Sequence, residues 1–295
     1  MYDIEKFYQA EDVADAVRAL SADPDAVIIS GGSDVLIKIR EGKLAGCSLV
    51  SIHGIEALSG ITMEEDGTIV IGPATTFSHI ANNKMIRKHI PMLGDAVDQA
   101  GGPQLRNIGT VGGNVCNGVT SADSASSLCC YDAILVLTGP EGVREVPISQ
   151  WYTGPGRTVR EHNEVLTSIR ILKENYEGFG GHYIKYGKRG AMEIATLGCA
   201  VSVKLTEDRK HVADLRLAYG VAAPTPVRCR QTEENAKGRP VGEALAEAVG
   251  AGALEEVNPR TSWRASKEFR LQLVEELAKR ALKQAVLNAG GEWDA

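Results

Sequence analysis

The chain has 295 residues, a formal net charge of -6 at pH 7 and 43% hydrophobic residues. This length suffices for two domains with cores of their own, and the acidic balance argues against nucleic-acid binding, which needs excess positive charge. The apolar runs are too short to span a bilayer, and the N-terminus does not resemble a secretion signal, so we expect a cytoplasmic protein that binds neither nucleic acid nor membrane.

In chain order, the first part of the sequence predicts short strands and helices separated by turns. Apolar residues at helical spacing predict a helix over 10–22, which Pro24 ends. Strands are predicted at 27–29, 49–52 and 68–71, and helices over 77–83 and 85–99 with a break near Pro91. The glycine-rich segment 100–117 is not expected to form a regular element of the core.

The second part of the sequence predicts strands followed by helices. Strands at 133–137 and 143–146 are joined by a turn, and those at 164–171, 182–186, 196–205 and 212–221 are interpreted as an antiparallel meander. Helices are predicted over 242–250 and 266–288, and the second should pack over the meander. With a boundary near 172–181, the chain divides into a domain over 1–175 and a smaller domain over 180–290.

The six cysteines give no metal-binding pattern. They contain no C-x-x-C pair, no Cys/His zinc spacing and no ferredoxin-like run. We therefore expect no metal in this chain, and any iron-sulfur cluster should belong to another chain. We interpret the cysteines as small buried hydrophobic residues.

Residues 28–34, the first glycine loop, follow a predicted strand and read Ile28-Ile29-Ser30-Gly31-Gly32-Ser33-Asp34. Without a Cβ, glycine lets successive N–H groups converge on an anion, and the Ser33 hydroxyl adds a donor. The loop matches neither the Rossmann nor the P-loop pattern. Taken alone, it is equally consistent with an ordinary strand-to-helix turn.

Residues 106–124, the second glycine loop, contain Gly109-Thr110-Val111-Gly112-Gly113-Asn114 and, further on, Asp123. This segment predicts a row of backbone donors. It also contains several hydroxyl and amide side chains and one carboxylate suited to a sugar hydroxyl. Long loops this rich in glycine are costly to order without a ligand, so they are usually functional. The two loops together therefore predict a nucleotide site far more strongly than either one alone.

The sequence resembles the FAD-binding subunits of molybdenum hydroxylases, especially those of bacterial xanthine dehydrogenases. The segments that carry the resemblance are both loops, the strand 182–186, and residues 219–228 and 262–270. The resemblance covers nearly the whole chain. It implies an α+β fold with a two-lobed FAD-binding domain of the vanillyl-alcohol-oxidase (PCMH-like) type. A smaller C-terminal domain of antiparallel sheet plus helices, like that of CO dehydrogenase flavoproteins, should follow.

The resemblance also implies which residues contact a non-covalent FAD. Both loops should wrap the pyrophosphate, Asp123 should bind the sugar-alcohol part, and Leu166 and Lys185 should contact the cofactor as well. Without the resemblance, a lysine on a predicted strand is more often a solvated edge residue. The implied contacts are Ile28, Ile29, Ser30, Gly31, Gly32, Ser33, Asp34, Val35, Gly109, Thr110, Val111, Gly112, Gly113, Asn114, Asp123, Leu166 and Lys185.

The resemblance implies an oxidoreductase subunit in which the flavin does the chemistry and no side chain has a catalytic role. Electrons should come from 2Fe-2S clusters in one partner subunit, after oxidation of substrate at a molybdopterin centre in another, and pass to NAD+. Two other interpretations stay open: a self-contained FAD-dependent oxidase of the wider flavoprotein class, and a non-enzymatic assembly module.

Overall fold

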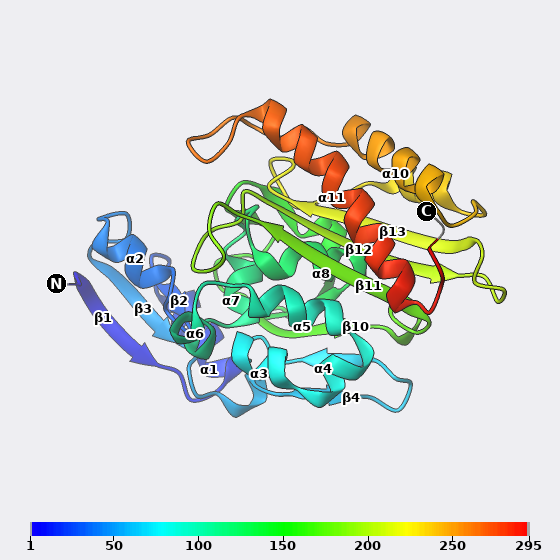
Figure 1. The fold of residues 1–295 in the computed structure, drawn as a ribbon. Coiled ribbons are helices and arrows are strands. Elements are labelled where there is room, and N and C mark those ends of the chain that lie inside the picture. The colour runs from blue at the N-terminus through cyan, green and yellow to red at the C-terminus, as the bar shows by residue number, and fades with distance from the viewer. Residues whose placement is uncertain (1, 294–295) are drawn as a thin grey trace.

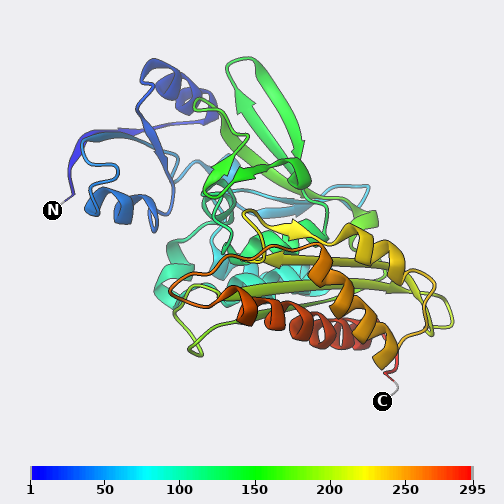
Figure 2. The same cartoon turned by 90° about the horizontal axis from the view of Figure 1, so that it is seen from above.

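A computed structural model of the chain describes residues 2–293, and the N-terminal part forms a small lobe that projects from the rest (Figures 1 and 2). Its three strands are parallel and lie in the order β1-β3-β2. The lobe comprises β1 (Ile4–Gln9), α1 (Val13–Ala22), β2 (Val27–Ile29), α2 (Val35–Arg40) and β3 (Cys47–Ser51). Asp12 caps α1 by accepting a hydrogen bond from the Asp15 amide, and this cap explains why the helix begins at Val13.

A five-stranded antiparallel sheet in the order β4-β5-β10-β6-β7 follows the lobe. Its strands are β4 (Ile61–Met63), β5 (Ile69–Ile71), β6 (Ile134–Gly139), β7 (Gly142–Pro147) and β10 (Val165–Ile171). The strand predicted at 164–171 is therefore real, but its place in the meander was wrong. It pairs with β5 and β6 instead, because its buried residues Leu166, Ile169 and Ile171 belong to the central core.

Helices fill the long connection between β5 and β6. They are α3 (Phe77–Asn82), α4 (Lys84–His89), α5 (Pro91–Asp98), α6 (Pro103–Ile108), α7 (Val111–Cys116) and α8 (Asp123–Cys130). The expectation that 100–117 holds no regular core element was wrong, because α7 buries Val111 and Val115. The Thr110 hydroxyl accepts a hydrogen bond from the Gly113 amide at 3.2 Å, and this cap starts a helix despite the glycines.

The C-terminal part is an antiparallel sheet in the order β11-β12-β13-β14, as predicted for its three long strands. Its elements are β11 (Phe179–Tyr186), β12 (Leu197–Leu205), β13 (Val212–Gly220), β14 (Val227–Arg228), α9 (Arg230–Ala236), α10 (Glu243–Glu255) and α11 (Lys267–Asn288). Helix α11 lies across β11 and β12 on one face, and α5 and α8 cover the other (Figure 1). Both faces of β12 are therefore buried.

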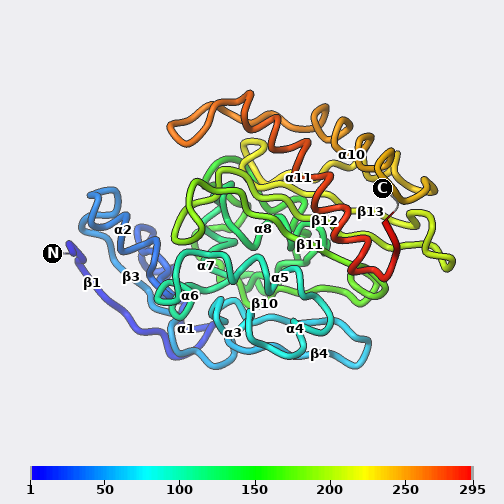
Figure 3. Tube along the Cα trace, viewed as in Figure 1, coloured from blue at the N-terminus to red at the C-terminus, as the bar shows by residue number. Residues whose placement is uncertain are grey.

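Short elements complete the fold: a ribbon of β8 (Tyr152–Gly154) and β9 (Arg157–Thr158), and the 3-10 turns Glu56–Leu58, Ile148–Gln150 and Lys173–Asn175. The N-terminal lobe and α10 lie at opposite ends of the molecule (Figure 3). Five of the six cysteines are buried and all six are free thiols, as expected for small hydrophobic residues. No helix within 2–293 combines the length and apolar composition that crossing a bilayer requires.

A cluster of charged side chains joins the C-terminal sheet to the segment after α8. Asp132 accepts from Arg230 at 3.0 Å and from Arg228, and its second oxygen lies 3.3 Å from Arg216. Burial raises the pKa of the Asp132 carboxyl, but the neighbouring guanidinium groups outweigh that effect and lower it. The cluster fixes how the sheet sits against the central core.

Candidate cofactor site

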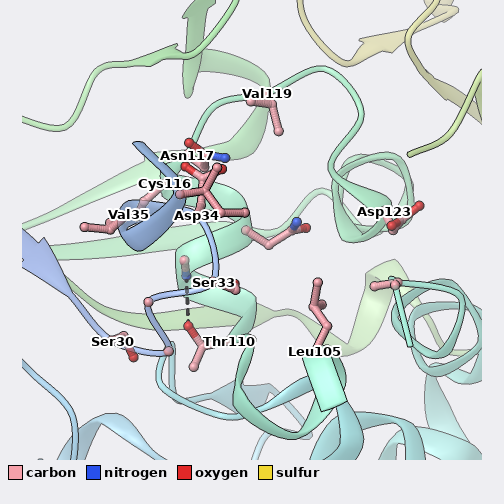
Figure 4. A pocket seen from close by; sticks show the side chains of 18 of the residues that line it. Ser30, Ser33, Asp34, Val35, Leu105, Thr110, Cys116, Asn117, Val119 and Asp123 are labelled. Atoms are coloured by element: carbon pink, nitrogen blue, oxygen red, sulfur yellow. Dashed lines mark hydrogen bonds between the residues drawn. The ribbon is translucent and has the colours of Figure 1, made fainter. Parts of the chain in front are cut away.

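A cavity of about 1290 Å³ lies between the N-terminal lobe and the rest of the chain, and both glycine loops line it. Figure 4 shows Ser30, Ser33, Thr110 and Asp123 around this space. Of the residues predicted from the sequence, those that line it are Ile28, Ser30, Gly31, Gly32, Ser33, Asp34, Val35, Gly109, Thr110, Gly112, Gly113, Asn114, Asp123 and Leu166. The structure thus brings together segments that are far apart in the sequence.

Three predicted residues do not line the cavity wall. Ile29 packs in the small core of the lobe, and Val111 is fully buried in the central core. Lys185 lies behind the wall, where it contacts Asp123. These three side chains support the wall from behind.

The two glycine loops touch each other through their backbones. A Cβ placed on Gly31 would lie 1.9 Å from the carbonyl oxygen of Ile108, which no real side chain permits. On the other side of the cavity, a Cβ on Gly112 would lie 2.4 Å from the Cβ of Pro73. Glycine is required at both positions by this close approach of protein to protein.

The two loops differ in the hydrogen-bonding state of their amides. The amides of Gly31, Gly32 and Ser33 donate to no residue within 2–293. In the second loop, by contrast, Val111 donates to the Thr75 carbonyl at 3.1 Å and Gly112 to that of Pro73 at 2.8 Å.

The neighbouring amides of the second loop are paired as well. Gly109 donates to the Leu105 carbonyl, Gly113 to the Thr110 hydroxyl and Asn114 to the Thr110 carbonyl. Five of the six amides in 109–114 are therefore bonded within the protein, and only that of Thr110 donates to no residue within 2–293. The first loop, by contrast, offers three consecutive free amides, which can bind an anion.

Ser30 adds an unsatisfied polar atom at the same wall. Its hydroxyl is buried and has no hydrogen-bond partner within the described residues. A buried hydroxyl without a partner is costly, so a ligand that bonded to it would remove that cost. This orphaned group and the free amides of the first loop fit a phosphate-bearing cofactor.

Asp123, the first residue of α8, forms a buried ion pair with Lys185 on β11. The ammonium lies 3.0 and 3.1 Å from the two carboxylate oxygens, and the side chains are only 11% and 7% exposed. The Tyr183 hydroxyl donates to the same carboxylate at 3.2 Å, and Lys185 also donates to the Gln99 carbonyl at 2.9 Å. Lys185 is thus not a solvated edge residue.

The electrostatics of this pair suit a binding role. Burial raises the pKa of the Asp123 carboxyl, and the Lys185 ammonium and the Tyr183 hydroxyl act against that rise. Burial, together with the charge of Asp123, also raises the pKa of Tyr183 well above its usual value, so Tyr183 remains a donor. Because a carboxylate has about four acceptor positions, Asp123 can still accept from a ligand hydroxyl.

The cavity has two ends of different character. One end is apolar, with Val27, Ile52, Val165 and Leu166 on its wall, and Arg160 lies beside it. The Arg160 guanidinium donates to the carbonyl groups of three residues in the loop before β10, at 2.8 to 3.1 Å. This end can take a planar apolar group, with an ordered loop closing it.

The other end is lined by the loop 187–194 together with Trp263 and Arg264. The carboxylate of Glu193 accepts from the amides of Lys188 and Arg189, both at 2.9 Å, and these bonds lower its pKa. Glu193 therefore shapes the loop. Gly187 leaves room for it, since a Cβ there would overlap the carboxylate.

Sequence reasoning missed the contact between Lys38 and the second loop. The Lys38 ammonium lies 2.7 Å from Asp34, one helical turn earlier, and donates to the Asn117 side-chain oxygen at 2.8 Å. The i,i+4 spacing from Asp34 was a readable signal, but nothing in the sequence pointed to Asn117 as a partner. This bond joins the N-terminal lobe to the second loop above the cavity.

Comparison with known proteins agrees with this geometry. A family model described as the FAD binding domain in molybdopterin dehydrogenase matches residues 2–171, and the CO dehydrogenase flavoprotein C-terminal domain matches 182–285. The chain is 43% identical to the xanthine dehydrogenase FAD-binding subunit of Escherichia coli O157:H7 over 292 residues, 99% of each chain. It is 29% identical to the carbon monoxide dehydrogenase medium chain of Hydrogenophaga pseudoflava, covering 95% of this chain and 96% of that one.

A solved structure is also similar. Carbon monoxide dehydrogenase from Hydrogenophaga pseudoflava, in the form lacking the Mo-pyranopterin moiety, matches with a TM-score of 0.92 and 27% identity over 98% of this chain and 99% of that one. The chain belongs to the family of FAD-binding subunits of molybdenum hydroxylases. Its α+β fold, with an FAD-binding part followed by a CO dehydrogenase flavoprotein-like C-terminal domain, is confirmed.

Proposed function

We propose that this chain is the electron-transferring flavoprotein subunit of a multi-subunit molybdenum hydroxylase resembling xanthine dehydrogenase. In this proposal it takes electrons from 2Fe-2S clusters of one partner subunit, and a second partner carries the molybdenum cofactor. The final acceptor is NAD+. The observation that carries the proposal is that two glycine loops and a buried carboxylate meet at one cavity, in a chain without cysteine-cluster motifs.

The proposed FAD site uses the two loops differently. The free amides of Gly31, Gly32 and Ser33 and the hydroxyl of Ser30 hold the pyrophosphate. The second loop, including Thr110, forms the opposite wall and holds the first loop in place through the Gly31 contact. The amides of Gly109, Val111, Gly112, Gly113 and Asn114 are already bonded within the protein, so these residues act by shape.

The other proposed contacts divide between the two ends of the cavity. Asp123 accepts from a hydroxyl of the sugar-alcohol chain, and Lys185 keeps that carboxylate ionised and oriented. Leu166 contributes to the apolar end. The same proposal divides the chain into an FAD-binding domain over 1–175 and a C-terminal domain over 180–290, and it assigns the chain to a cytoplasmic complex.

FAD, when bound, supplies a centre that can take up electrons singly and release them as a pair. This chain's residues bind and orient the cofactor and exclude water from it. No side chain is assigned as a general acid or base. Asp123 is held by Lys185 in an ion pair and serves binding.

The test is purification of the full chain, alone and after co-expression with its candidate partners. The expected product is yellow, carries one FAD that dithionite reduces, and turns over no substrate alone. Oxidation of a substrate by the chain alone would support a self-contained oxidase instead. A colourless chain that still folds would overturn the proposal, and mass spectrometry of the copurified complex with a metal and flavin count tests the partners.

A further inference from the structure

The part of the cavity that contains the free amides is bounded at two points where the N-terminal lobe meets the second loop. At one point Gly31 lies directly against the carbonyl group of Ile108. At the other point the Lys38 ammonium donates to the Asn117 side-chain oxygen at 2.8 Å. The first loop and α2 run between these points on one side, and the second loop with α7 on the other. The two contacts therefore close these segments into a ring.

The ring surrounds the proposed pyrophosphate site. Residues from both of its sides line the cavity, among them Ser33, Lys38 and Asn117. In Figure 4, Asn117 and Asp34 lie above Ser33, and Thr110 lies below it. A pyrophosphate bound to the free amides of the first loop therefore lies inside the ring, and the two ends of the cavity lie beyond it.

The shape of FAD makes this ring an obstacle to loading. The molecule has a wide planar group at each end, adenine and isoalloxazine, and a narrow pyrophosphate between them. A ring that closes around the narrow middle does not let either wide end pass through it. One of the two contacts must therefore open before FAD enters or leaves the cavity.

The Lys38–Asn117 contact is the one that can open. The Lys38 side chain is 39% exposed, so water can replace its bond to Asn117. Among residues 2–293, this is the one hydrogen bond between α2 and the chain outside the lobe. Helix α1, by contrast, packs against β6 and β10, and Nε2 of His162 donates to the carbonyls of Leu20 and Asp23 at 3.1 and 3.0 Å. The lobe is thus held firmly at α1 and lightly at α2.

We infer that Lys38 and Asn117 form a clasp over the cofactor, which is loaded and released when their hydrogen bond opens and α2 moves away from the second loop. In the described part of the chain, the lobe is connected to the rest only through 52–60, so this segment and α1 serve as the pivot. Asp34, 2.7 Å from the Lys38 ammonium, keeps that group in place while the clasp is open. The inference rests on the proposed function, because only a ligand with two wide ends needs such an opening.

The test is the kinetics of FAD binding to the full chain, followed by FAD fluorescence. Stopped-flow mixing with the flavin-free chain gives the association rate, and dilution of the loaded chain gives the release rate. Asn117→Ala removes the clasp but keeps the Lys38 charge, so both rates should rise roughly tenfold, the effect of losing one hydrogen bond to a charged group. The affinity should change little, because the two rates rise together. Asn82→Ala is the matched control, since Asn82 donates to the Ser78 carbonyl at 2.8 Å away from this cavity.

A second variant distinguishes a clasp from a direct contact between Asn117 and FAD. In a Lys38→Met background, Asn117→Ala should change neither rate further, because the bond is already absent. Faster release with unchanged or slower association in Asn117→Ala describes an ordinary binding contact and would overturn the inference, as would unchanged rates or additive effects of the two substitutions. A wild-type chain that binds no FAD would overturn the proposed function and the inference with it, whereas a wild-type chain that binds FAD leaves the variants to decide the clasp alone.

Discussion

The contact between the two glycine loops is the most sensitive point of the site, and Gly31→Ala tests it. The added Cβ would start 1.9 Å from the Ile108 carbonyl oxygen, whereas real Cβ contacts are not found below 3.0 Å. The loops would have to separate by roughly 1 Å, and overpacking of this kind costs about 1–3 kcal/mol. We expect an unfolding free energy lower by that amount and a flavin affinity at least about tenfold weaker, since 1.4 kcal/mol is a tenfold change.

Urea denaturation of the flavin-free chain and flavin absorbance after dialysis measure the two effects separately. Gly154→Ala is the control, because a Cβ there would meet only the Arg157 side chain, at 3.9 Å. A larger side chain such as Gly31→Trp should act in the same direction. If Gly31→Ala kept the denaturation midpoint and flavin content of Gly154→Ala, the loop contact would not hold the site.

Three further changes test other parts of the structure. Asp123→Asn leaves the Lys185 ammonium buried without a counter-charge, so we expect flavin loss and about 3–5 kcal/mol less unfolding free energy by denaturation; wild-type values for both would contradict this. Because Arg144 lowers the pKa of Glu164 from its ordinary 4.5, that pair stabilises the fold above this pH and the contribution is lost as pH falls through the lowered pKa. Denaturation curves of Glu164→Gln and wild type should therefore differ at pH 7 and converge in acid, and a constant difference would refute the assignment. Asp132→Ala should lower the melting temperature more than Asp132→Asn. Both substitutions remove the shared carboxylate, but of the two new residues only asparagine tolerates the local φ of 45° well. Equal melting temperatures would exclude a backbone effect.

The elements were readable from the sequence wherever one periodicity dominated. The helix at 266–288 and the long strands of the C-terminal sheet fit this pattern, and the i,i+4 pairs Glu275–Lys279 and Glu276–Arg280 form on that helix. Partners of strands were harder to predict. The strand 164–171 joins a sheet whose other members end at residue 147, and local pattern carries no information on such distant pairing.

The sequence predicted which residues form the candidate site better than it predicted the hydrogen bonds that they make. Both loops and Asp123 line one cavity, but the sequence could not show which amides the protein itself uses. The carbonyls of Pro73 and Thr75 accept hydrogen bonds from the amides of Gly112 and Val111. Both residues lie in a connection where no sequence pattern predicted a contact with the second loop. Trp263 and Arg264 appeared only within the family resemblance, because an exposed tryptophan beside an arginine has no periodic pattern of its own.

The place of β10 in its sheet bears on how the chain is made. This strand lies at the centre of β4-β5-β10-β6-β7, yet it is the last of the five to be synthesised. Until residue 171 leaves the ribosome, β5 and β6 lack the strand that lies between them, and the backbone groups along their facing edges stay unpaired. The nascent chain must therefore wait for more than half its length before the wall of the cavity exists, and a cofactor can be loaded only after that point.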